Sequence, residues 1–180
     1  MFKTIYMRFP AVAALPLAVA ATGALANGAH DQGTNGDGHG APHGAPGEPS
    51  QVSRSIEVVM DDTYFEPERL EVQAGETIRF EIRNKGTLVH EFNIGTPEMH
   101  ADHADEMMAM MEEGVMTPQS LDEQAMEGMH DHANSVLLEP GESDEVVWTF
   151  PEETDVTLEF GCNVPGHYAS GMVGEFELKH

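Results

Sequence analysis

The feature that most restricts the fold of this chain is a series of short runs, from residue 51 onward, in which apolar and polar residues alternate. The clearest run covers residues 77–83, where Ile78, Phe80 and Ile82 would share one face of a strand. Gly- and Pro-containing turns separate the runs. This pattern predicts an antiparallel β-sandwich with strands near residues 55–60, 70–73, 77–83, 87–94, 135–138, 145–150, 156–160 and 173–178.

Residues 95–134 interrupt the strand pattern. The segment contains no Lys or Arg, yet it holds most of the chain's 12 methionines and several histidines. Within residues 98–113 a stripe of side chains recurs at helical spacing: His103, Met107, Met110 and Met111. Thr117 followed by Pro118 offers an N-cap and a first-turn proline for a second helix. We therefore expect a Met/His-rich helical insert between two strands.

Residues 1–26 are typical of a cleaved signal peptide. Lys3 and Arg8 precede a short apolar stretch, and Ala24-Leu25-Ala26 forms a small-x-small cleavage signal. The apolar stretch is too short for a transmembrane helix, which needs about 20 residues. We expect export to the periplasm and a mature form without a membrane span.

Residues 27–50 form a low-complexity tail rich in Gly, Pro, Ala and Asp, and we expect it to be disordered. Its histidines are either weak ligands for Cu(II) or Zn(II) or incidental members of a solvated spacer: His30, His39 and His43. The remaining residues, 51–180, are expected to form one domain that carries the insert.

The chain is strongly acidic, with a formal net charge of −24 from 8 Lys and Arg against 32 Asp and Glu. Such a charge excludes nucleic acid as a ligand, since phosphate binding requires a basic patch. It is compatible with metal cations and with a redox partner that has a basic docking surface. High solubility explains the charge equally well.

The candidate chemistry centres on a single cysteine, Cys162. Exported proteins usually pair their cysteines, so a lone one is inert, bonded to another molecule, or occupied by a metal. Cys162 begins the run Cys162-x4-His167-x4-Met172 between two predicted strands. These three side chains are donors of a blue-copper site, which also needs a second histidine. His90, which follows the turn at residues 84–86, can supply it. The sequence predicts a near-trigonal His90, Cys162 and His167 plane with Met172 as a weak axial ligand.

Each of these residues has a plainer interpretation when it is taken alone. A cysteine or methionine can simply fill the core, and a histidine can lie on the surface. The combination and spacing in a β context favour a metal site instead. Zinc is the competing metal, but structural zinc sites rarely use methionine and usually contain more cysteine.

The chain resembles the cupredoxin family over residues 55–178 apart from the insert. The resemblance rests on Phe65-Glu-Pro67-x-x-Leu70-x-Val72-x-Ala-Gly75-Glu76-Thr-Ile-x-Phe80, on Asn84-x-Gly86-x-x-x-His90 and on the loop from Cys162 to Met172. It implies a Greek-key β-sandwich with one type 1 copper site. Its implied ligands are His90, Cys162, His167 and Met172.

Two features refine the resemblance. The ligand-loop spacing is most similar to that of rusticyanin, whereas His90-Glu91-Phe92 and the insert look more like CopI-type periplasmic copper-tolerance cupredoxins. Glu91 stands where azurin-like and rusticyanin-like members place Asn or Ser, and simple electron shuttles lack a long acidic insert.

Copper tolerance through copper binding and redox cycling is the function that these features favour. The alternative is an electron carrier of a respiratory chain. We expect no enzymatic activity, because a four-ligand site has no open position and the sequence has neither a second, trinuclear set of histidines nor a hydrolase motif. The stripe of His103, Met107, Met110 and Met111 either binds extra copper or packs on the sandwich.

Overall fold

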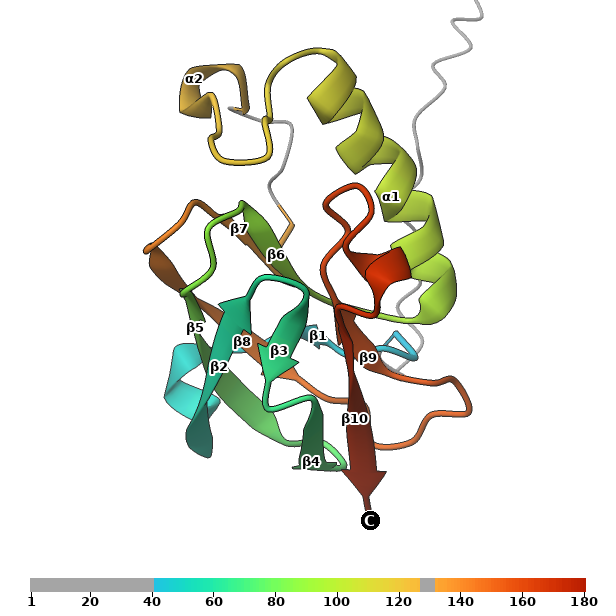
Figure 1. The fold of residues 1–180 in the computed structure, drawn as a ribbon. Coiled ribbons are helices and arrows are strands. Elements are labelled where there is room, and N and C mark those ends of the chain that lie inside the picture. Colours follow the sequence, from blue (N-terminus) through green and yellow to red (C-terminus); the bar gives the residue numbers. More distant parts are fainter. Residues whose placement is uncertain (1–40, 127–131) are drawn as a thin grey trace, which may run out of the picture. The chain divides into compact units, whose positions relative to one another are not determined.

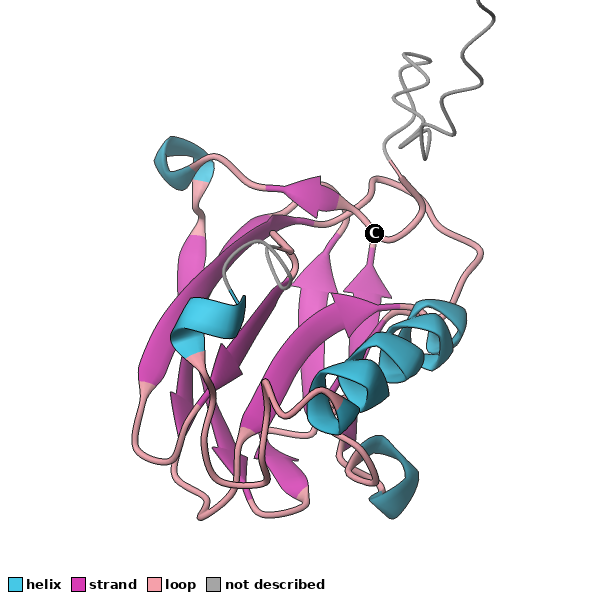
Figure 2. Ribbon diagram, turned by 90° about the horizontal axis from the view of Figure 1, so that it is seen from above, coloured by secondary structure: helices cyan, strands magenta, loops and turns pink. Residues whose placement is uncertain are grey.

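The structure, a computed structural model, describes residues 41–126 and 132–180. The predicted signal peptide and the histidines His30, His39 and His130 lie outside the described residues. Two five-stranded sheets pack face to face, which confirms the predicted β-sandwich (Figures 1 and 2). Within the described part of the chain, every helix is too short or too polar to cross a bilayer.

One sheet has the strand order β1-β8-β5-β2-β3, and the other has the order β4-β10-β9-β6-β7. The strands of the first sheet are β1 (Ala45–Pro46), β2 (Arg54–Asp61), β3 (Tyr64–Glu66), β5 (Thr77–Asn84) and β8 (Ser143–Thr149). Those of the second are β4 (Arg69–Gln73), β6 (His90–Gly95), β7 (Ser135–Leu138), β9 (Glu159–Gly161) and β10 (Val173–Lys179).

The strands do not all pair in the antiparallel manner that the sequence suggested. β2 pairs with β5, and β4 pairs with β10, in parallel. The reason is the path of the chain after β2: it turns back as the short strand β3, changes sheet as β4, and returns beside β2 as β5. The remaining pairings between named strands are antiparallel.

The core lies between the two sheets. Ile78, Phe80 and Ile82 of β5 are 0, 0 and 1% exposed, so the alternation predicted for this strand is confirmed. Phe80 packs on Phe92 of β6 and Phe176 of β10, with ring centroids 5.5 and 5.8 Å apart. Burial of each such side chain stabilises the fold by about 1.5–3 kcal/mol. These contacts join β5 of the first sheet to β6 and β10 of the second.

The predicted first helix is confirmed as α1 (Pro97–Glu112), which leaves the end of β6. Thr96 caps it: its Oγ1 accepts a hydrogen bond from the Met99 N–H at 3.3 Å, and Pro97 occupies the first helical position. In Figures 1 and 2 the helix lies along one side of the sandwich, next to the loop between β9 and β10.

The predicted start of the second helix at Thr117 is wrong. The Thr117 hydroxyl bonds to the Ser120 hydroxyl at 2.7 Å and closes a turn, so it does not cap a helix. The short helix α2 (Glu123–Met126) begins later, where Asp122 Oδ1 accepts the N–H groups of Gln124 and Ala125. A turn closed by a side-chain hydrogen bond therefore forms here in place of the helix that the Thr-Pro pair favoured.

The last part of the tail predicted to be disordered belongs to the sandwich. Residues 45–46 form β1 and pair with β8. The Trp148 indole N–H donates to the His43 carbonyl at 3.0 Å, and the two rings stack with centroids 5.8 Å apart. The ordered fold therefore begins before residue 51, because an aromatic residue on β8 anchors the incoming chain.

Candidate metal centre

Three of the four predicted ligands converge at one end of the second sheet. His90 begins β6, Cys162 follows β9, and His167 precedes the short helix η2 (Tyr168–Ser170). The Cys162 sulfur lies 3.9 Å from His90 Nδ1 and 3.3 Å from His167 Nδ1. All three donor atoms lie within 4.8 Å of one another. Residues 72 positions apart along the chain thus offer one sulfur and two nitrogens to a common point.

Met172 is held next to this cluster by its backbone. Its carbonyl accepts the Cys162 N–H, and its own N–H donates to the His167 carbonyl, both at 3.1 Å. The side chain is completely buried. The loop between Cys162 and Met172 therefore closes on itself, and the backbone of Met172 is bonded directly to two residues of the cluster.

Two glycines allow the loop to close within so few residues. Gly166 and Gly171 have φ angles of 88° and 97°, in the left-handed region that a side chain disfavours. Between them η2 makes one tight turn, ending with the Gly171 N–H bonded to the Tyr168 carbonyl at 2.9 Å. The turn at Gly166 allows His167 to lie beside Cys162, and the turn at Gly171 returns the chain to Met172.

A carboxylate fixes the orientation of His90. The ring Nε2 donates to Asp62 Oδ1 at 3.1 Å, so Nδ1 faces the cysteine. Hydrogen bonds from Thr87 to Asp62 lower the pKa of this carboxyl to about 2 and keep it charged. Burial lowers the pKa of both His90 and His167, which favours the neutral imidazole that metal binding requires.

Cys162 is fully enclosed, and burial raises the pKa of its thiol to about 12. The Glu91 N–H donates to the sulfur at 3.3 Å, which stabilises the thiolate and partly offsets this rise in pKa. A thiolate in this position needs a bound cation to balance its charge. One soft sulfur with two imidazole nitrogens is a donor set for a thiophilic transition metal, so the residues present fit such an ion.

Comparison with known proteins decides the family. The family model of the cupredoxin-like domain matches residues 17–124. The chain belongs to the cupredoxin family. The matched part of this cupredoxin includes His90 and ends before Cys162, so the convergence of Cys162 and His167 with His90 is structural information that the family match does not contain.

Curated relatives share most of the length of this cupredoxin. The copper-resistant cuproprotein CopI of Pseudomonas aeruginosa is 47% identical over 155 residues, which are 78% of this chain and 84% of that protein. The protein of the same name from Rubrivivax gelatinosus is 37% identical over 168 residues, covering 90% of this chain and 92% of that protein.

Solved structures agree with the fold. Reduced auracyanin from Roseiflexus castenholzii is 25% identical and superimposes with a TM-score of 0.52, covering 72% of this chain and 99% of that one. Auracyanin B is 21% identical with a TM-score of 0.56, covering 78% and 99%. The second likeness bears on the fold alone.

The residue after His90 has a structural role that the sequence did not reveal. Glu91 is completely buried, and its Oε2 accepts both the backbone and the side-chain N–H of Asn163, at 3.2 and 2.9 Å. Its Oε1 lies 2.9 Å from His103 Nε2 on α1. One carboxylate therefore ties β6, the residue next to Cys162 and the insert helix together. A carboxylate within the short strand β6, directly after a predicted ligand, was the available signal.

His103 provides the positive charge for this buried carboxylate. Burial alone would lower the pKa of His103, but hydrogen bonds and charge from Glu91 and Glu106 outweigh it and raise the pKa to about 9. The imidazole is therefore protonated at neutral pH. An ion pair links the insert to the end of the sandwich where His90, Cys162 and His167 converge.

A second contact presses the insert on the ligand loop. His100 of α1 is buried, with Nδ1 within hydrogen-bonding distance of the Asn163 side chain. Its ring lies against Tyr168, with centroids 5.4 Å apart, and the Tyr168 hydroxyl donates to Glu159. Helix α1 thus packs on the loop at Asn163, next to Cys162, and at Tyr168, next to His167.

The methionine stripe of α1 mainly serves packing. Met107 and Met110 are 0 and 3% exposed and belong to the hydrophobic core, and Met111 packs against its edge. Of the alternatives for this stripe, packing on the sandwich applies to these thioethers. His103 points instead towards Glu91 and Glu106.

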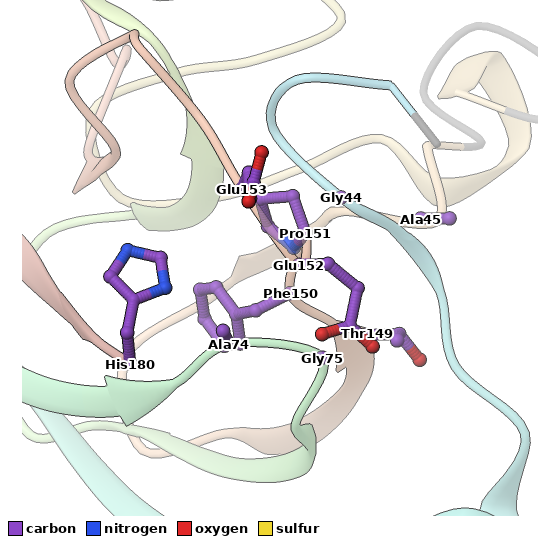
Figure 3. A pocket seen from close by; sticks show the side chains of 10 residues that line it. All are labelled: Gly44, Ala45, Ala74, Gly75, Thr149, Phe150, Pro151, Glu152, Glu153 and His180. Carbon is purple, nitrogen blue, oxygen red and sulfur yellow. The ribbon is translucent and has the colours of Figure 1, made fainter. Parts of the chain in front are cut away.

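A hollow of about 790 Å³ lies elsewhere, between the ends of β1, β8 and β10 (Figure 3). Phe150, Glu152 and His180 are among its lining residues. Its side chains are not among the described donor groups close enough to share an ion.

Proposed function

We propose that this cupredoxin binds one copper ion through His90, Cys162, His167 and Met172 as a type 1 site. The convergence of the Cys162 sulfur with the Nδ1 atoms of two histidines is the observation that carries the proposal. Copper bound there would supply one-electron redox chemistry, since thiolate favours Cu(I) and imidazole accepts Cu(II). The protein's own part is to hold the donors in place and keep water away from the sulfur.

The physiological role that we propose is copper tolerance in the periplasm, through binding and redox cycling of copper and without enzymatic turnover. Relatives that align with most of this chain are named copper-resistant cuproproteins. The acidic surface and the insert distinguish the chain from a minimal electron shuttle. Growth on copper of a deletion strain, restored by the wild-type gene and not by Cys162→Ser, would support this role. Equal restoration by both genes would contradict it.

Visible absorption of the copper-loaded mature protein tests the site. We expect an intense thiolate-to-Cu(II) band, because a cysteine sulfur is the donor. The band should vanish in Cys162→Ser and persist in His180→Ala, which changes an exposed histidine at the chain end. A spectrum unchanged by the loss of Cys162 would refute the assignment.

Electron transfer to a partner protein is a second candidate function. His90 and Cys162 are buried, whereas His167 is partly exposed and lies beside the exposed Gly166 and Ala169. The His167 ring edge is therefore the natural exit for an electron. Oxidation of the reduced protein by a redox protein with a basic surface should be fast and should slow with added salt. A rate independent of salt would argue against such docking.

A further inference from the structure

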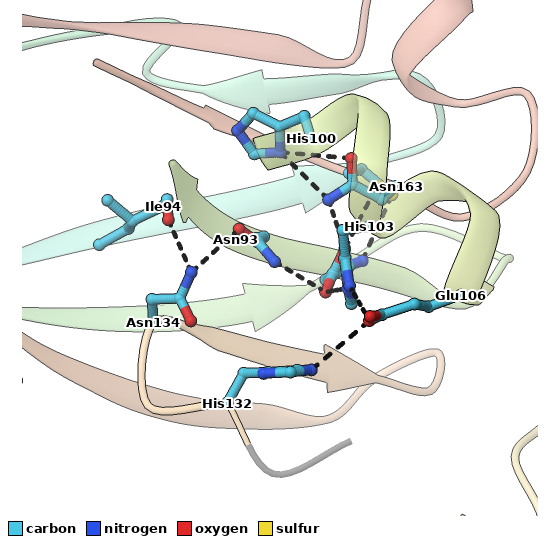
Figure 4. A network of polar contacts seen from close by, with 10 residues as sticks. Asn93, Ile94, His100, His103, Glu106, His132, Asn134 and Asn163 are labelled. Atoms are coloured by element: carbon cyan, nitrogen blue, oxygen red, sulfur yellow. Dashed lines mark hydrogen bonds and ion pairs between the residues drawn. The ribbon is translucent and has the colours of Figure 1, made fainter. Parts of the chain in front are cut away.

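A second group of potential ligands lies on the insert, apart from the cysteine site. His103 and Glu106 stand one helical turn apart on α1, and His132 comes from the segment that leads into β7 (Figure 4). His103 Nδ1 is 2.8 Å from Glu106 Oε2, and His132 Nε2 is 3.7 Å from the same oxygen. The three donor atoms all lie within 4.8 Å of one another. Separations of this size suit ligands of one ion.

His103 is held from behind in the way that metal-binding histidines usually are. Its Nε2 lies 2.9 Å from Glu91 Oε1, and Asn163 in turn fixes that carboxylate. Histidine ligands typically donate their other ring N–H to a carboxylate, which sets the ring orientation. The nitrogen presented to Glu106 and His132 is consequently Nδ1. Because His103 is protonated at neutral pH, an ion that binds Nδ1 displaces the Nδ1 proton, and the charge of the ion replaces that of the imidazolium beside Glu91.

A cation can reach the three side chains. They line a cleft of about 240 Å³, to which the carboxylate of Asp102 also contributes. The side chains of Glu106 and His132 are 62% and 42% exposed, whereas that of His103 is 10% exposed. The inner ligand is therefore rigid, and the outer two can adjust as an ion enters. The absence of Lys and Arg from residues 95–134 leaves the cleft electrostatically attractive to cations.

The donor types indicate which ion this cleft would take. Met107 and Met110 are buried in the core, and Met99 lines the cleft, but the three clustered donors are two imidazole nitrogens and a carboxylate oxygen. This combination suits borderline divalent ions such as Zn(II) and Cu(II), whereas Cu(I) prefers sulfur. We propose that His103, Glu106 and His132 form a second metal site, for a divalent cation, that works independently of the cysteine site.

Zinc titration of the mature protein, with a chromophoric chelator as competitor, tests the proposal. The copper-loaded wild type should bind one Zn(II) more than Glu106→Gln and His132→Gln, or bind it at least about 10-fold more tightly. Both positions are exposed, so the fold should survive. Glu112→Gln removes an exposed carboxylate from the same helix outside the cluster and serves as the matched control.

The outcomes separate this site from the cysteine site. Zinc binding that is unchanged in Glu106→Gln and His132→Gln would overturn the proposal, and so would an equal loss in Glu112→Gln, which would indicate attraction to charge alone. In Cys162→Ser the difference between the wild-type cluster and Glu106→Gln should remain. Its disappearance there would place the zinc at the cysteine cluster and would refute the second site. The type 1 site is tested separately by its absorption band.

Discussion

Replacement of His103 by glutamine removes the positive charge that balances the fully buried Glu91 carboxylate. The glutamine amide can still donate a hydrogen bond, so the substitution isolates the charge. The pKa of His103 is raised from 6.5 to about 9, which corresponds to about 3 kcal/mol of stabilisation at neutral pH. Loss of one partner of a buried ion pair typically costs about 3–5 kcal/mol. We therefore expect His103→Gln to lower the free energy of unfolding by about 3 kcal/mol.

Urea unfolding of the metal-free protein at pH 7, in the presence of a chelator, measures this loss. A double-mutant cycle with Glu91→Gln should give a coupling energy of about 2 kcal/mol or more, because each single substitution leaves the remaining charge buried without its partner. His132→Gln is the control: its side chain is 42% exposed, and we expect a change within about 0.5 kcal/mol. Additive effects of the two single substitutions would refute the ion-pair argument.

The pH dependence provides a separate check. The folded-state pKa of His103 is raised, so its contribution is fully present below the unfolded value of 6.5 and is lost as the pH rises through about 9. The stability difference between wild type and His103→Gln should accordingly shrink from pH 6.5 to pH 9 and above. A difference that stays constant across this range would show that packing, and not charge, is responsible.

Three further predictions concern the surroundings of the cysteine site. Asp62→Ala should weaken copper binding in a competition titration by about 10–100-fold, since His90 would lose the group that orients it; unchanged affinity would assign that role to the backbone alone. Asn84→Ala should cost about 2 kcal/mol in urea unfolding, because its amide donates to the Leu88 and Leu138 carbonyls. In the metal-free native protein the buried Cys162 should react with a thiol reagent far more slowly than in urea, and equal rates would contradict its burial.

Local periodicity and ligand spacing made much of this molecule predictable. The alternation of Ile78, Phe80 and Ile82 indicated a half-buried strand, and β5 has that pattern. The spacing from Cys162 to His167 reflects a single tight loop, so two of the ligands could be placed together without knowledge of the fold. The sequence did not show how His90 would reach these two residues; it does so because β6 pairs with β9.

The features that escaped prediction depend on contacts between distant segments. Asp62 meets His90 because β2 ends, and β6 begins, at the same side of the sandwich. No local sequence pattern indicates this. The buried pair of Glu91 and His103 depends on how α1 lies against β6. Thr117 and Pro118 carry a helix-start signal, but the bonds of Thr117 to Ser120 use the hydroxyl in a turn.

The insert connects β6 to β7, which are neighbours in the same sheet. It is therefore an enlarged hairpin loop, and lengthening such a loop costs little conformational entropy, roughly 0.6 kcal/mol for each doubling. Segments of different length and composition can be exchanged at this point while the sandwich keeps its strand register. A new segment would need one cationic side chain at the position of His103 to accompany Glu91. That requirement makes the hairpin a replaceable segment with one fixed attachment point, at Glu91 beside Cys162.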